Sequence, residues 1–189
     1  MADEWKKSIE ELASAEASAR KEAAGEIYRA GKSAAEAATA KWWAEGELAR
    51  LLLGNRPEVT VGVAVGRETF GKIRVANGVA RLAEVPSEQD AEEFALHFGE
   101  EISLDILTSR APGGDGAIAR YLTKFGEGVQ QVEFRCSDVD RATEILKEKF
   151  GVKSVYPETR PGADGTRVNF FLMERPGGGK ILIELFEKS

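Results

Sequence analysis

The sequence predicts an α+β fold in which a pair of N-terminal α-helices precedes two βαβββ modules in tandem. Composition changes near residues 54–58, where Gly and Pro separate an Ala-rich segment from one rich in Val, Ile and Phe. Apolar residues recur at helical spacing before this point, and short strand and helix patterns alternate after it. We therefore expect a helical domain over residues 1–56 and a second domain over residues 57–189.

The N-terminal segment has the pattern of a helical hairpin. Apolar residues from Trp5 to Ile27 recur at three- and four-residue steps, which predicts one face of an amphipathic helix. We expect Gly31 to end this helix, and a second helix to run from an N-cap at Ser33 to Gly54. An Ala-rich face buries little area per residue, so the hairpin should pack on the second domain or on another subunit. A homodimer is the expected assembly.

The second part of the chain repeats one order of elements. Each module begins with a strand and a helix and continues with three strands, which gives modules of about 57–111 and 126–189. A helix over 116–124 joins them. The expected strands are 59–65, 79–85, 92–98 and 102–107 in the first module and 128–136, 152–157, 166–173 and 180–186 in the second. The expected module helices are 67–76, ended by Asn77-Gly78, and a helix from Ser137 or Asp138 to Phe150, ended by Gly151.

Composition excludes several classes of partner. The 189 residues carry 26 Lys and Arg against 32 Asp and Glu, a net charge of -6, which disfavours nucleic acid. No apolar run approaches the roughly 20 residues that span a bilayer, so no membrane partner is expected. Cys136 is the only cysteine. An intrachain disulfide is therefore impossible, and a cytoplasmic location is the expectation.

Two longer stretches carry a family resemblance. LDILTSRAPGGDGAIARYLTKFGEGVQQVEFRCSDVD resembles the join between the two modules of methylmalonyl-CoA epimerases, which belong to the vicinal oxygen chelate superfamily. RPGADGTRVNFFLMERPGGGKILIELFEKS is similar to the end of the same enzymes. The Gly-rich turn in this stretch predicts a hairpin. The resemblance covers residues 57–188 and implies that the two modules form a cupped mixed sheet.

The resemblance also implies a set of metal ligands. The four ligand positions of the superfamily fall on Thr60, Asp105, Gln131 and Glu184. Strand alternation, taken without the family, places the last three opposite apolar neighbours. Glu133 shares the face of Gln131 and is a candidate replacement ligand or a residue that fills the cavity.

This chain departs from the family at two of these positions. Epimerases normally have His where Thr60 and Gln131 stand here. The remaining oxygen ligands suit a hard cation such as Mg²⁺, Mn²⁺ or Ca²⁺ rather than zinc, and the implied cofactor is one of these or Co²⁺. The alternative is a hydrogen-bonded polar lining without metal.

The candidate catalytic residues lie in the first module. In the family two carboxylates move a proton at the carbon alpha to a thioester, and their positions match Glu88 and Glu93 here. His97, the only histidine, shares strand parity with Glu93 and could donate to an enolate oxygen, move a proton or supply the missing imidazole ligand. Solvent-exposed side chains without a catalytic role are the alternative for all three.

Two functions remain open at this point. The first is a metal-dependent isomerase resembling methylmalonyl-CoA epimerase, with an acyl thioester or another small carbonyl compound as ligand, acting through a metal-stabilised enolate. The second is a non-catalytic binding or assembly module of the same fold with a degenerate metal site. The four retained carboxylates favour the first, and the two missing histidines favour the second. Whether the chain is an enzyme is therefore left undecided by the sequence.

Overall fold

The computed structural model describes residues 5–54, 57–176 and 178–188. The contacts among its residues divide the chain into two compact units. The first combines residues up to Gly31 with Thr60–Gln130, and the second combines Lys32–Val59 with the residues from Gln131 onward. The predicted domain boundary falls at residues 55 and 56, which lie outside the described residues.

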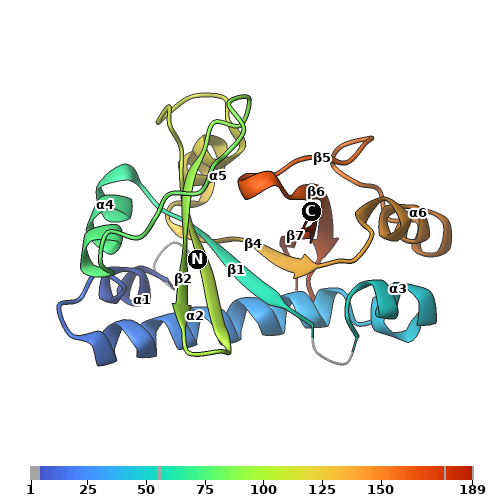
Figure 1. Cartoon of the computed structure of the whole chain (residues 1–189), viewed down its shortest axis with the longest axis horizontal. Helices are drawn as coiled ribbons and strands as arrows, with labels where there is room; N and C mark the ends of the chain where they lie inside the picture. The colour runs from blue at the N-terminus through green and yellow to red at the C-terminus, as the bar shows by residue number, and fades with distance from the viewer. Residues whose placement is uncertain (1–4, 55–56, 177, 189) are drawn as a thin grey trace. The chain divides into compact units, whose positions relative to one another are not determined.

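The helices are α1 (Lys6–Glu11), α2 (Ala17–Ala38), the 3-10 turn η1 (Trp42–Ala44), α3 (Gly46–Leu51), α4 (Arg67–Ala76), α5 (Ala117–Phe125), α6 (Val139–Phe150) and the 3-10 turn η2 (Ala163–Gly165). The strands are β1 (Val59–Ala64), β2 (Glu92–Phe98), β3 (Ile102–Thr108), β4 (Gly128–Arg135), β5 (Arg160–Pro161), β6 (Arg167–Glu174) and β7 (Lys180–Glu187) (Figure 1).

The sheet of the first unit has the strand order β2-β3-β1. β2 and β3 are antiparallel and joined by a short turn, whereas β1 runs parallel to β3. Parallel strands need a long crossover, and α4 lies within the one between β1 and β3. Phe70 of α4 packs edge-on against Phe94 of β2, with ring centroids 4.7 Å apart. This contact fixes which face of the sheet is covered by helix.

The second unit repeats the arrangement with the order β4-β7-β6-β5. β4 and β7 are parallel, and β6 is antiparallel to β7. α6 begins at Asp138, whose carboxylate accepts a hydrogen bond from the Arg141 backbone N–H at 2.9 Å. It ends at Gly151, whose φ of 65° is left-handed. Both ends of this helix therefore follow the sequence-based prediction.

The N-terminal segment is helical, as predicted, but its breaks differ. α1 ends at Glu11, and α2 then continues through Gly31 and Ser33 to Ala38, so the predicted break and N-cap are wrong. Gly31 is a packing residue: a Cβ added there would lie 2.7 Å from Val61 Cγ1. The helix therefore keeps its hydrogen bonds and uses the glycine to approach β1 closely.

Two predicted strands are not formed. Residues 79–85 make no ladder, and in this segment the Ala83 N–H donates to the Glu93 carbonyl oxygen at 2.9 Å. Val79 has a φ of 54°, which a strand does not tolerate. Residues 152–157 form a single bridge, between Ser154 and Phe171. Both segments border the sheet of their unit, where a strand has a partner on one side and pairs weakly.

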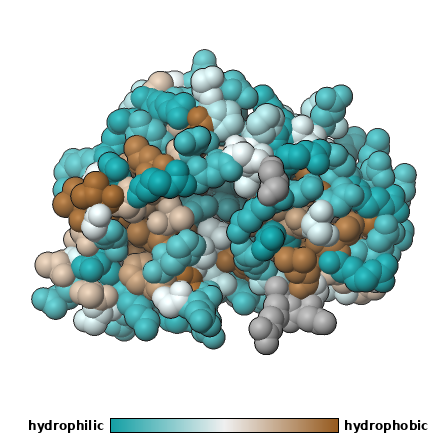
Figure 2. Space-filling view, viewed as in Figure 1, coloured by the Kyte–Doolittle hydropathy of each residue, from teal (hydrophilic) through white to brown (hydrophobic). Residues whose placement is uncertain are grey.

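The predicted second N-terminal helix is divided among the end of α2, η1 and α3, and the remaining predictions of secondary structure are confirmed. The α+β class, the mixed sheet, the two modules, the two module helices and the helix that joins the modules agree with the structure. β6 and β7 form the predicted hairpin, in which the Arg175 N–H donates to the Gly179 carbonyl oxygen at 2.9 Å, whereas Gly177 lies outside the described residues. Hydrophilic side chains dominate the face seen in Figure 2, and hydrophobic ones gather in small separate patches. Within the described part of the chain, no helix has the length and apolar character needed to cross a membrane.

Candidate functional site

Three buried polar side chains lie together on one face of the sheet in the second unit. The parallel register of β4 and β7 pairs Gln131 with Leu182 and Glu133 with Glu184. Because alternate residues of a strand share a face, Gln131, Glu133 and Glu184 lie on the same side. Their exposed fractions are 7%, 7% and 9%. We call these three residues the buried carboxylate cluster.

The Gln131 amide connects the two carboxylates. Its Nε2 lies 3.0 Å from Glu133 Oε1 and 2.6 Å from Glu184 Oε2, so one amide group donates to both. Hydrogen bonds in the protein interior are electrostatically stronger than those exposed to water. The amide therefore fixes how both carboxylates are oriented.

Strand alternation is the reason that these residues share one face. On β4, Val132 is 0% and Phe134 is 1% exposed, and on β7 both Ile183 and Leu185 are 0% exposed. These apolar residues occupy the opposite face, toward the helix-covered core. A slip of one residue would exchange the two faces, so burial of the apolar residues determines where the polar residues point.

The chemistry of the buried carboxylate cluster fits a hard divalent cation. Two carboxylates and an amide oxygen are ligands of the kind that Mg²⁺ and Ca²⁺ take. Gln131, however, directs its nitrogen at both carboxylates, and would have to turn its Oε1 toward a cation in order to bind it. Within the described ranges, no group of three or more His, Cys, Asp or Glu side chains is arranged to hold a metal ion. The amide hydrogens and a cation are thus alternative partners for the same carboxylates.

The other predicted strand residues gather in the first unit. Asp105 pairs with Ala95 on one side and with Gly62 on the other, and His97 pairs with Ser103. By alternation, one face of this sheet therefore presents four of the predicted residues, Thr60, Glu93, His97 and Asp105. Thr60 is buried and donates from Oγ1 to Ser103 Oγ at 3.2 Å, whereas His97 is exposed. Glu93 and Asp105 are half-buried.

Glu88 lies apart from this face. It is exposed in the turn that precedes β2. Sequence reasoning missed the residue that fixes this loop, Asp90. Asp90 accepts hydrogen bonds from Ser109 Oγ at 2.7 Å and from the Ala111 N–H at 3.0 Å. A Cβ on Gly116 would lie 2.8 Å from Asp90 Cβ, so this glycine leaves room for the carboxylate.

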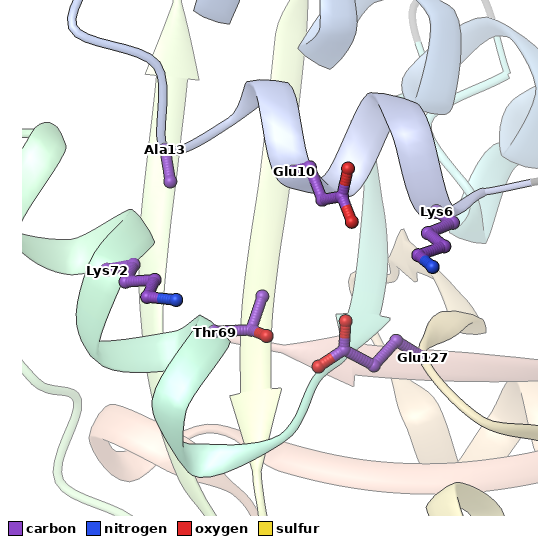
Figure 3. A pocket seen from close by; sticks show the side chains of 6 residues that line it. All are labelled: Lys6, Glu10, Ala13, Thr69, Lys72 and Glu127. Carbon is purple, nitrogen blue, oxygen red and sulfur yellow. The ribbon is translucent and has the colours of Figure 1, made fainter.

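A pocket of the first unit contains none of the predicted residues. It lies between α1, α4 and the residue before β4, and has a volume of about 460 Å³. The side chains that line it are Lys6, Glu10, Ala13, Thr69, Lys72 and Glu127 (Figure 3). Glu127 Oε1 accepts the Gly66 N–H at 2.8 Å, and Lys72 pairs with Glu68 at 2.6 Å. The charged groups of Glu127 and Lys72 therefore already have partners within the protein.

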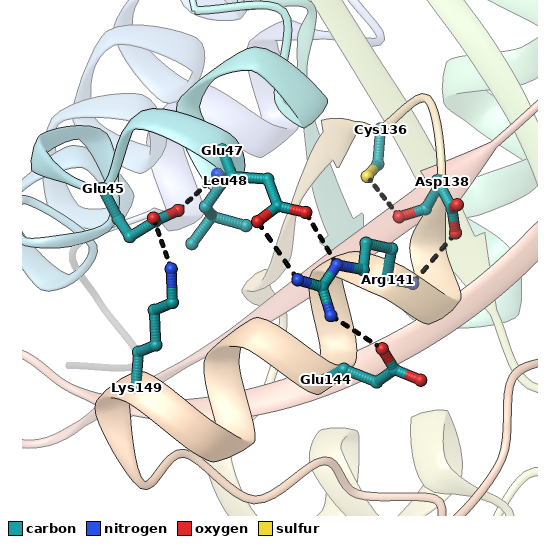
Figure 4. Close-up of polar contacts among 8 residues, drawn as sticks. All are labelled: Glu45, Glu47, Leu48, Cys136, Asp138, Arg141, Glu144 and Lys149. Carbon is teal, nitrogen blue, oxygen red and sulfur yellow. Dashed lines mark hydrogen bonds and ion pairs between the residues drawn. The ribbon is translucent and has the colours of Figure 1, made fainter.

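Cys136 is a buried thiol at the end of β4. Burial raises the pKa of this thiol to about 11, and its Sγ donates to the Asp138 carbonyl oxygen at 3.2 Å (Figure 4). A thiol with such a pKa is almost entirely protonated at neutral pH, and the thiolate is the reactive form. Cys136 is therefore a packing residue, as its isolated position in the sequence suggests.

An ionic network joins α3 and α6 within the second unit (Figure 4). Arg141 Nε lies 2.7 Å from Glu47 Oε1, and Lys149 Nζ lies 2.7 Å from Glu45 Oε1. The hydrogen bond from Arg141 lowers the pKa of Glu47, and that from Lys149 lowers the pKa of Glu45. These groups lie near the surface and bind one another, so they serve the packing of the two helices.

Solved structures resemble this chain over more than two thirds of its length. Methylmalonyl-CoA epimerase from Mycobacterium tuberculosis is 29% identical with a TM-score of 0.55, and the match covers 69% of this chain and 86% of that one. This chain shares the fold of methylmalonyl-CoA epimerases. The resemblance predicted from the two sequence stretches is thereby confirmed. No family model and no curated protein sequence matches the chain.

Several of the similar epimerases were solved with acyl-CoA compounds. A Streptomyces coelicolor epimerase variant in complex with 2-nitronate-propionyl-CoA is 26% identical with a TM-score of 0.54, over 69% of this chain and 95% of that one. An epimerase in complex with methylmalonyl-CoA and NH4+ is 27% identical with a TM-score of 0.54, over 69% and 92% of the two chains. These ligands direct the choice of compounds for testing the present chain.

Proposed function

We propose that this chain is an epimerase-like isomerase that moves a proton at the carbon alpha to the carbonyl of an acyl thioester. The observation that carries the proposal is the buried carboxylate cluster, in which Glu133 and Glu184 stand at 7% and 9% exposure in a chain with the fold of methylmalonyl-CoA epimerases. Carboxyl groups are rarely buried, and they are the usual acids and bases of enolisation.

The residues divide into two proposed roles. Glu93, half-buried on β2, is the proposed base at the alpha carbon, and His97 is the proposed partner in returning the proton. Glu88, exposed in the turn before β2, is the second carboxylate that the resemblance implies. Glu133, Glu184 and Gln131 are the proposed residues that hold a divalent cation, with Asp105 and Thr60 as the further ligands implied by the family. A bound cation would supply electrostatic stabilisation of the enolate oxygen.

Exchange of the alpha proton with solvent tests this proposal. Wild-type protein in deuterated water with added Mg²⁺, Mn²⁺ or Co²⁺ should incorporate deuterium into methylmalonyl-CoA. Glu93→Gln should lower the rate by about 100-fold or more, because the amide cannot accept the proton. The matched control is Glu92→Gln, since Glu92 is the neighbouring residue on the opposite face and pairs with Arg67 at 3.5 Å. Absence of exchange by the wild type, or equal rates for both variants, contradicts the proposal.

One observation favours a second function, a non-catalytic binding or assembly module. Gln131 donates to both carboxylates, so they have hydrogen-bond partners without any metal. Isothermal titration of the purified protein with Mn²⁺, Mg²⁺, Ca²⁺ and Co²⁺ separates the two functions. An isomerase should bind at least one of these cations, and Glu184→Gln should weaken that binding. If none binds and no deuterium is exchanged, the second function stands.

A further inference from the structure

We propose that Arg160 binds a negatively charged group of the ligand on the sheet face that carries Glu184. The inference deepens the proposed function and rests on it for the choice of an acyl thioester as the ligand. It names a feature of the substrate class: besides its carbonyl, the ligand carries an anion, either a carboxylate on the acyl group or a phosphate on the carrier.

The register of three strands places Arg160 on that face. β5 pairs with β6 so that Arg160 lies opposite Val168, and β6 pairs with β7 so that Phe170 lies opposite Glu184. Paired residues share a face, and so do Val168 and Phe170, which are two apart on β6. Arg160, Phe170 and Glu184 therefore project from the same side of the sheet of the second unit.

Two ring contacts join the arginine to the strand beside the carboxylate. The Arg160 guanidinium carbon lies 4.4 Å from the ring centroid of Tyr156. The Tyr156 and Phe170 rings meet edge to face, with centroids 5.9 Å apart and an interplanar angle of 76°. Phe170 is the cross-strand neighbour of Glu184. Arg160, Tyr156 and Phe170 thus form a row that leads from the guanidinium to Glu184 of the buried carboxylate cluster.

The charge of Arg160 has no counterion in the described part of the chain. Two other arginines of this sheet do have one: Arg135 lies 2.8 Å from Glu58, and Arg167 pairs with Asp140 and, at 3.3 Å, with Glu187. Arg160 instead stacks on an aromatic ring. A stacked guanidinium keeps the N–H groups at its edge available, and their fork matches the two oxygens of a carboxylate or phosphate.

Apolar residues beside this row suit the uncharged part of such a ligand. Leu172 is 51% exposed, and it lies on the same face as Phe170, two residues further along β6. Its cross-strand partner is Leu182, which in turn pairs with Gln131. The exposed part of this leucine is apolar surface that contact with an acyl chain would bury. The face therefore carries the Arg160 guanidinium, two aromatic rings and an exposed apolar side chain.

Calorimetric binding to three compounds tests the inference without requiring turnover. Methylmalonyl-CoA carries the carboxylate and the phosphates, propionyl-CoA carries only the phosphates, and methylmalonyl-pantetheine carries only the carboxylate. Arg160→Gln should weaken binding of the compounds that carry the recognised anion by about 10- to 100-fold. Arg160→Lys should recover part of the loss, because it restores the charge and not the fork. Arg50→Gln, at an exposed arginine of α3, is the matched control and should bind like the wild type.

The pattern of losses identifies the anion. A loss for methylmalonyl-pantetheine and not for propionyl-CoA assigns the carboxylate, and the reverse assigns a phosphate. Equal affinities of the wild type and Arg160→Gln for all three compounds, or no binding of any compound by the wild type, overturns the inference. Failure of the proposed function is a separate result, because loss of deuterium exchange with Arg160-dependent binding intact contradicts the isomerase and leaves the anion site standing.

Discussion

The two units have the same order of strand and helix, but they differ in how deeply the polar residues of their strands are buried. In the second unit, Gln131, Glu133 and Glu184 are at most 9% exposed and joined by two hydrogen bonds. In the first unit, His97 is exposed and Glu93 is half-buried. Burying charge is costly unless it is satisfied. The second unit therefore contains the stronger structural indication of a site, whereas the proposed base belongs to the first.

Among the tests of this difference between the units, removal of the Gln131 amide should have the largest effect on stability. Gln131→Leu keeps the size of the side chain and deletes both hydrogen bonds, so we expect a loss of about 2–4 kcal/mol in the free energy of unfolding at pH 7. Urea denaturation measures it. The matched control is Thr60→Val in the first unit, which deletes the 3.2 Å contact to Ser103 and should cost about 1 kcal/mol or less. Equal losses in the two variants would mean that the units do not differ in this respect.

The titration of the Cys136 thiol, in the second unit, provides a second test of the difference between the units. Burial raises the pKa of Cys136 from 9.0 to about 11, so the folded state holds its proton more tightly than the unfolded state. Stability from this thiol is therefore complete below pH 9 and is lost as the pH rises to about 11, by about 2–3 kcal/mol. Unfolding free energies of wild type and Cys136→Ala, compared at pH 8 and pH 10.5, isolate the contribution. A difference between the two proteins that stays constant with pH contradicts it.

Close backbone packing in the first unit gives a third and smaller effect. Gly31→Ala places a methyl group 2.7 Å from Val61 Cγ1 and should cost about 1–3 kcal/mol in the free energy of unfolding. Gly71→Ala on α4 is the control, since a Cβ there meets nothing within 4 Å, and it should stabilise by about 0.5–1 kcal/mol. Thermal denaturation distinguishes the two. Stabilisation by both substitutions would show that α2 does not need this close approach.

Local patterns predicted the elements that local interactions specify. The side-chain cap at Asp138 and the left-handed glycine at Gly151 were sufficient to place both ends of α6. Gly31 was misread because a glycine can either end a helix or allow close packing, and only the position of Val61 distinguishes the two. Strand 79–85 was predicted from its pattern, but Val79 has a left-handed φ and, among the described residues, the segment keeps a single backbone bond to β2, from Ala83 to Glu93. The homodimer and the cytoplasmic location stay predictions.

By itself, the sequence determined the α+β class, the tandem modules, the resemblance to methylmalonyl-CoA epimerases and the face on which each polar strand residue lies. Alternation along a strand is a property of the backbone, so it can be read from the order of residues. The tertiary structure decided that Gln131 bridges Glu133 and Glu184, and that Arg160 stacks on Tyr156 on the face of Glu184. The bond from Gln131 to Glu184 joins residues far apart in the chain, and the place of Arg160 on the face of Glu184 depends on the pairing of β5, β6 and β7, which no local pattern specifies.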